Sequence, residues 1–178
     1  MKISVKKILE DMPKDLTDIE KVRYIYLSVG DIFSYDRDYI YLGREREILA
    51  EYSKEMSIDD IEKINVSILH GKIGADIAKK KYGVNEQIQK AIQYHTETNP
   101  NMDTLAKIIY VSDKIEKNRK SEKFDLEYER NLAKEDIDAA VLFIIDASIK
   151  KVIKKGKLLH PTIVETRNKI IMNKMQQN

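Results

Sequence analysis

The stretch SILHGKIGADIAKKKYGVNEQIQKAIQYHTETNPNMDTLAKIIYVSDKIEKNR, residues 67–119, decides the fold of this chain. It holds two of the three histidines, His70 and His95, and the aspartate Asp113. His95 follows apolar residues at intervals of seven, four and three, and Asp113 follows them at eight and four, which places both on apolar helix faces. Because burying an unpaired imidazole or carboxylate costs about a few kcal/mol, these side chains need partners there. Two histidines and an aspartate that enter one helical core form an arrangement able to bind a metal ion.

Helical periodicity extends beyond this stretch and predicts an all-α protein of roughly eight to ten helices. The chain of 178 residues has only six glycines and three prolines, which favours helix. It shows no strand-like alternation and no internal repeat, and its length suits one domain with a real core. Residues 118–125 are polar and basic and are expected to form a loop. Helices are expected over residues 3–12, 17–35, 44–56, 57–64, 67–83, 85–95, 103–117, 135–155 and 161–172.

The composition narrows the classes of function. A net charge of +2 gives no reason to expect binding to nucleic acid or to a membrane surface. The chain has no cysteine, which excludes disulfides, thiolate metal sites and a cysteine nucleophile and fits a reducing cytoplasm. We find no signal peptide and no apolar run of about 18 residues that could span a bilayer. We therefore expect a cytoplasmic protein, and the sequence leaves a homodimer open.

From about residue 61 to residue 171 the sequence resembles the YqeK family of HD-domain proteins. This resemblance implies an HD-type helical bundle and the symmetrical hydrolysis of diadenosine tetraphosphate into two ADP. It covers about 60% of the chain and depends on a series of short sequence motifs in the family's order. The motifs are LHG (69–71), AIQYHT (91–96), PNM (100–102), KIIYVSD (107–113), IE (115–116), NR (118–119), KGKLLHP (155–161) and RN (167–168).

The resemblance also implies a metal centre. The family holds two iron ions with a histidine, an adjacent His-Asp pair, two further histidines and a final aspartate. When these motifs are matched to those of the family, His70 and His95 correspond to the two further histidines, and Asp113 corresponds to the final aspartate. The expected cofactor is therefore a divalent metal, iron or manganese.

The first half of that centre departs from the family, since the chain has no histidine before His70. The nearest candidate for the His-Asp pair is Arg37-Asp38, so Asp38 is the expected bridging ligand, with Asp36 as a rival. A guanidinium stays protonated and cannot bind a cation. The number of bound ions is thus two, one or none. We expect residues 1–43 to form an atypical N-terminal helical segment and residues 44–178 the HD-like domain.

The same resemblance suggests which residues contact the substrate, a nucleotide or dinucleoside polyphosphate. Thr98-Asn99 stands where the family usually has Gly-Arg, which removes one phosphate contact. No catalytic acid or base is identified. The expected substrate-binding residues are Thr96, Arg119, His160 and Arg167.

Each of these residues also has a purely structural interpretation. His70 and His95 can be core histidines that bond to backbone groups, and Asp113 can pair with a lysine such as Lys79 or Lys107. His160 can mark a helix junction and Arg167 can be a surface charge. The lysines between residues 150 and 157 suit the end of a helix dipole, or attract a polyphosphate.

Two functions follow from these alternatives. The first is a divergent metal-dependent phosphohydrolase of the HD type. The second is a catalytically inactive HD-domain protein that binds a nucleotide or a protein partner. The missing first histidines favour the second, and the retained second half of the metal centre favours the first.

Overall fold

The computed structural model describes residues 54, 56–115 and 125–177. The chain divides into two compact units, residues 1–56 and 57–178, and the described helices belong to the second. The expected N-terminal segment lies outside the described residues, so the predicted boundary after residue 43 stays a prediction.

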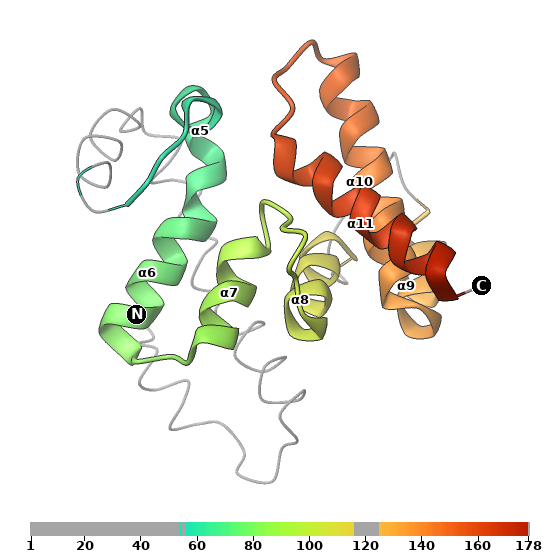
Figure 1. The fold of residues 1–178 in the computed structure, drawn as a ribbon, viewed down its shortest axis with the longest axis horizontal. Helices are drawn as coiled ribbons and strands as arrows, with labels where there is room; N and C mark the ends of the chain where they lie inside the picture. Colours follow the sequence, from blue (N-terminus) through green and yellow to red (C-terminus); the bar gives the residue numbers. More distant parts are fainter. Residues whose placement is uncertain (1–53, 55, 116–124, 178) are drawn as a thin grey trace, which may run out of the picture. The chain divides into compact units, whose positions relative to one another are not determined.

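The described residues form seven α-helices and one 3₁₀ turn, with no strand among them (Figure 1). The all-α prediction is confirmed. No helix in this part of the chain is long and apolar enough to cross a membrane. The elements are α5 (Asp60–Ile64), η1 (Val66–Leu69), α6 (His70–Tyr82), α7 (Glu86–Tyr94), α8 (Thr104–Ile115), α9 (Leu126–Glu135), α10 (Ile137–Lys154) and α11 (Pro161–Gln177).

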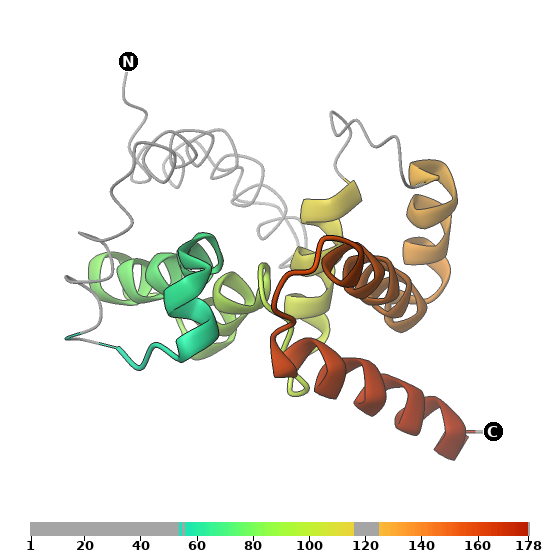
Figure 2. The same ribbon diagram turned by 90° about the horizontal axis from the view of Figure 1, so that it is seen from above.

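The core lies where α8 and α10 meet. Helices α6, α7 and α8 pack in chain order, and α10 contacts α8, α9 and α11 (Figure 2). Val141 and Ile145 of α10 and Ala106 of α8 are completely buried, as is Leu69 just before α6. Each large apolar side chain buried in this way contributes roughly 1.5–3 kcal/mol. This core fixes the ends of α6, α7 and α8, where the candidate site residues lie.

Local signals in the sequence set several helix ends. Asn85 accepts a hydrogen bond from the Ile88 N–H at 2.9 Å and so begins α7, as predicted. Gly83 ends α6 with a φ of 61°, a left-handed conformation that glycine adopts without strain. One expected cap is wrong: Ser67 lies inside the 3₁₀ turn, and α6 begins only at His70.

Helix α9 was not expected from the sequence. Its residues are mainly charged and polar, so the segment has few large apolar side chains that would mark it as a helix of the core. The signal that would have located it is Asp125, whose carboxylate accepts hydrogen bonds from the Glu127 and Tyr128 amides at 3.1 and 3.0 Å. α9 ends where Asp136 begins α10, so the two helices follow each other directly.

Replacing Asp136 with alanine is expected to lower the free energy of unfolding by about 1 kcal/mol or more. Its carboxylate accepts a hydrogen bond from the Ala139 amide at 2.9 Å, which caps α10, and another from Lys174 Nζ of α11 at 2.6 Å. Urea titration measures the loss. Asp136→Asn is the matched control, because it keeps the cap and removes the charge.

The effect of that charge should depend on pH. Lys174 and the amides at the start of α10 lower the pKa of Asp136 below its ordinary value of 3.8. A carboxyl whose pKa is lower in the folded state adds stability at neutral pH, and this stability disappears as the pH falls through the lowered pKa. The stability difference between wild type and Asp136→Asn should therefore decrease as the pH falls through this lowered pKa and vanish below it. A difference that persists there would contradict this role of the charge.

Candidate functional site

The structure brings His70 and His95 into contact. His70 is the first residue of α6, and His95 directly follows α7, so the short connection at residues 83–85 places the two ends side by side. Their Nε2 atoms lie 3.1 Å apart, and the ring centroids are 4.9 Å apart at an interplanar angle of 68°. The helical faces on which the sequence placed these residues therefore converge.

Hydrogen bonding fixes the tautomer of His95. Its Nδ1 lies 2.6 Å from the carbonyl oxygen of Ile92, and a carbonyl only accepts, so Nδ1 carries the proton and donates it. Burial, together with the neighbouring His70, lowers the pKa of His95 to about 4, against the opposing effects of Ile92 and Asp113. At neutral pH the ring is uncharged, and its lone pair lies on Nε2, the atom that faces His70. This is the state in which histidine binds metals.

The two Nε2 atoms are suitably spaced for one metal ion. Nitrogen ligands about 2.0–2.1 Å from an ion and at right angles to each other lie about 3.0 Å apart. The observed 3.1 Å matches this spacing. Within the described residues, no group of three histidines and carboxylates is close enough to hold an ion. The two imidazoles therefore fit as part of a ligand set whose further members are not assembled there.

Thr96 lies in the same place, as expected for a site residue. Its Oγ1 is 2.9 Å from His70 Nε2 and 3.2 Å from His95 Nε2. Gly71 permits this close packing: a Cβ at that position would lie 2.6 Å from the Gln93 carbonyl oxygen and 3.2 Å from Thr96 Oγ1. The glycine of the LHG motif is thus needed for steric reasons, because α6 and α7 are in contact at Gly71.

Asp113 lies on α8, close enough to the histidine pair for its charge to raise the pKa of His95. Its Oδ2 accepts a hydrogen bond from Lys114 Nζ at 2.5 Å. The two lysines considered from the sequence bond elsewhere: Lys79 to the Val84 carbonyl and Lys107 to Asp138. The lysine beside Asp113 is thus its own neighbour in the chain.

A second polar group surrounds His160, at the start of α11. His160 Nε2 lies 2.7 Å from Asp59 Oδ2 and 3.8 Å from Glu97 Oε1, and Nδ1 lies 2.7 Å from Thr162 Oγ1. Burial raises the pKa of Glu97 to about 7, against the effect of His160. His160 thus joins the loop that follows His95 to the segment before α5.

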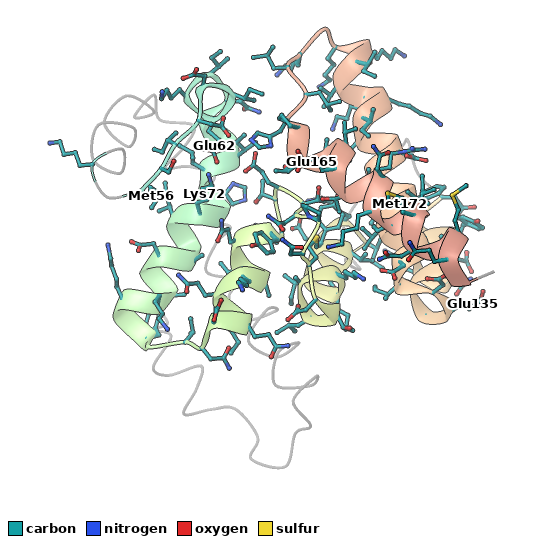
Figure 3. The ribbon with its side chains drawn as sticks, viewed as in Figure 1. Met56, Glu62, Lys72, Glu135, Glu165 and Met172 are labelled. Atoms are coloured by element: carbon teal, nitrogen blue, oxygen red, sulfur yellow. The ribbon has the colours of Figure 1, made fainter. Side chains whose placement is uncertain are left out.

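A buried ion pair lies beside this group. Glu62 of α5 is completely buried and pairs with Lys72 of α6, two residues after His70 (Figure 3). Glu62 also accepts a hydrogen bond from the Asp59 amide at 2.8 Å. A buried charge needs such partners, because removing one of them leaves the other uncompensated. The pair ties the start of α6 to α5.

Of the other predicted site residues, one pairs with a carboxylate of a neighbouring helix and two lie outside the described residues. Arg167 of α11 donates a hydrogen bond to Asp146 of α10 at 2.5 Å. In the loop that departs from the family, Thr98 is buried, and the side chain of Asn99 accepts a hydrogen bond from the Asn101 amide at 2.8 Å. Asp38 and Arg119 lie outside the described residues.

The structure also holds a pocket of about 330 Å³ between α8, α10, α11 and the loop before α8. Asn101 and Lys169, which share a hydrogen bond of 3.0 Å, lie in its wall with Lys107. None of the predicted site residues lines this pocket. The pocket is thus separate from the histidine pair.

Sequence reasoning did not single out Lys114, Glu97, Glu62 or Lys72. Charged residues on helices are usually solvated, and no spacing rule distinguishes these from the many others in the chain. Glu97 offered one weak signal, because it follows His95 by two residues. The burial of Glu62 had a local signal too, since Asp59 and Glu62 form a capping box.

Comparisons with known proteins identify the family of this chain. Residues 46–118 match the HD domain. The symmetrical bis(5'-nucleosyl)-tetraphosphatase of Bacillus subtilis is 30% identical over 143 residues, which are 80% of this chain and 76% of the relative. The enzyme of the same name from Halalkalibacterium halodurans is 29% identical over 136 residues, 76% of this chain and 72% of the relative.

A solved structure supports the same assignment. The crystal structure of a predicted HD superfamily hydrolase involved in NAD metabolism, from Clostridium acetobutylicum, is similar with a TM-score of 0.66 and 37% sequence identity. The match covers 73% of this chain and 67% of that one. Sequence and fold together show that this chain belongs to the HD-domain family of the symmetrical bis(5'-nucleosyl)-tetraphosphatases.

Proposed function

We propose that this protein is a divergent HD-domain phosphohydrolase that cleaves a dinucleoside polyphosphate, such as diadenosine tetraphosphate, into nucleoside diphosphates. His70, His95 and Asp113 would hold a divalent cation, and Asp38 would be a further ligand. The observation that carries the proposal is the pair of imidazoles with Nε2 atoms 3.1 Å apart, one of which has its tautomer fixed for binding a metal. Relatives named as tetraphosphatases support the class of substrate.

The expected metal is iron or manganese. Imidazole and carboxylate ligands suit both ions, and the chain has no thiolate that would favour a softer one. A divalent ion held by these residues would supply positive charge for a phosphoryl oxygen and would lower the pKa of a water molecule towards neutrality.

The chain's own residues prepare the site for this chemistry. The Ile92 carbonyl holds the His95 ring in one orientation, and burial keeps that ring neutral. The Thr96 hydroxyl lies within 3.2 Å of both Nε2 atoms, so it can donate a hydrogen bond to a phosphate oxygen bound beside them.

We propose that His160 contacts a more distant phosphate, because Glu97 and Asp59 hold it at the edge of the same loop. Arg119 and Arg167 remain candidates for further phosphate contacts, and Arg167 would have to leave Asp146.

Two measurements test the proposal together. Protein purified without a chelator should contain about one or two equivalents of iron or manganese by elemental analysis. The same protein, mixed with diadenosine tetraphosphate and Mn²⁺ or Fe²⁺, should yield ADP as the sole nucleotide product. A preparation that holds no metal and forms no ADP with either ion added would exclude this function.

One observation favours the alternative function, a catalytically inactive HD-domain protein. Asp113 already pairs with an ammonium group, and within the described residues no third ligand joins the two histidines. Such a protein would bind diadenosine tetraphosphate or ADP without turnover. Calorimetric binding without release of ADP would therefore favour this alternative.

A further inference from the structure

We propose that Lys114 is a built-in cation that competes with the metal ion for Asp113 and so limits metal affinity. This inference deepens the proposed function and rests on the metal site proposed above, with His70, His95 and Asp113 among its ligands. Neither the sequence motifs of the family nor the comparisons with known proteins assign a role to Lys114.

The first observation is the direction of the Lys114 side chain. Neighbouring residues on a helix point about 100° apart and do not ordinarily face each other. Lys114 Nζ nevertheless lies 2.5 Å from Oδ2 of Asp113, and only 27% of the lysine side chain is exposed. The lysine therefore folds back over α8 towards the site instead of extending into water.

The second observation is the set of groups around the ammonium. Lys114 Nζ also lies 3.5 Å from the His95 carbonyl oxygen and 5.4 Å from the centroid of the Tyr110 ring. The carbonyl groups at the end of α7 carry partial negative charge, and an aromatic face attracts cations. A carboxylate, a helix C-terminus and a ring thus converge on one position, which is a site built for a positive charge.

The consequence follows from electrostatics. Lys114 Nζ lies 3.5 Å from the carbonyl oxygen of His95, so its positive charge also lies close to the residue whose ring would bind the ion. A metal ion that takes Asp113 as a ligand must displace the ammonium and then bear its repulsion. Because a hydrogen bond between two charged groups is worth roughly tenfold to a hundredfold in an equilibrium constant, removing the ammonium should tighten metal binding by about tenfold.

The test measures Mn²⁺ affinity, which is independent of catalysis. Chelator-stripped full-length protein is titrated with Mn²⁺, and free Mn²⁺ is followed by its electron paramagnetic resonance signal. The variants Lys114→Gln and Lys114→Met both remove the charge, and the second keeps an unbranched side chain beside Tyr110. Lys114→Arg retains the charge. Lys90→Gln is the matched control, because Lys90 pairs with Glu86 on the exposed surface of α7.

Both neutral variants should bind Mn²⁺ about tenfold more tightly than wild type, while Lys114→Arg and Lys90→Gln keep the wild-type affinity. Wild-type affinity in both neutral variants would overturn the inference and leave the metal site intact. If no protein in the series binds Mn²⁺, the proposed metal site itself fails, and this inference fails with it.

Discussion

Replacing His70 with alanine is expected to remove the bound divalent ion and to lower the rate of diadenosine tetraphosphate hydrolysis about a hundredfold or more. His70 supplies one of the two nitrogen atoms whose 3.1 Å separation suits a common ion. The remaining imidazole, His95, would be left with Asp113, which is engaged by Lys114. Elemental analysis and an ADP release assay measure the two effects on the same preparation.

The third histidine provides the control for this experiment. His160 lies at the start of α11 and bonds to Asp59 and Thr162, so His160→Ala should retain the metal of the wild-type protein. We expect it to raise KM for the dinucleotide, because His160 is proposed to contact a distant phosphate. Circular dichroism establishes that both variants are folded. Full metal content and full activity in His70→Ala would refute the assignment of His70 as a ligand.

The convergence of the two histidines could be predicted because local signals determine it. Asn85 starts α7 and Gly83 ends α6, so the two helices are joined by a short turn. A short turn between helices with apolar faces forces them to pack side by side. The histidines at the facing ends then meet without further information.

The surroundings of the histidines could not be predicted in the same way. The approach of Lys114 to the end of α7 depends on a side-chain rotamer and on how α8 packs against α7. The link between His160 and Asp59 joins residues 101 positions apart in the chain. Periodicity describes one helix at a time and carries no information on such pairs.

The substitution Gly71→Ala should destabilise the protein, because it places a methyl group in the contact between α6 and α7. The added Cβ would lie 2.6 Å from the Gln93 carbonyl oxygen, a backbone atom in the last turn of α7, so the helices must separate. Overpacking of this kind costs about 1–3 kcal/mol or more, and the better helix propensity of alanine returns about 1 kcal/mol. We expect a net loss of roughly 1–2 kcal/mol in the free energy of unfolding by urea titration.

The same separation should weaken metal binding, because Gly71 adjoins His70 and its Cβ would also press on Thr96 Oγ1 at 3.2 Å. Gly156→Ala distinguishes this steric effect from a general effect of losing a glycine. Gly156 has a φ of 60° and no atom within 4 Å of an added Cβ, so alanine there costs only the left-handed backbone strain of about 1–2 kcal/mol. Gly156→Ala should therefore lose stability and keep the wild-type Mn²⁺ affinity, whereas Gly71→Ala should lose both. Equal Mn²⁺ affinity in the two variants would mean that the contact between α6 and α7 does not hold the imidazoles at their distance.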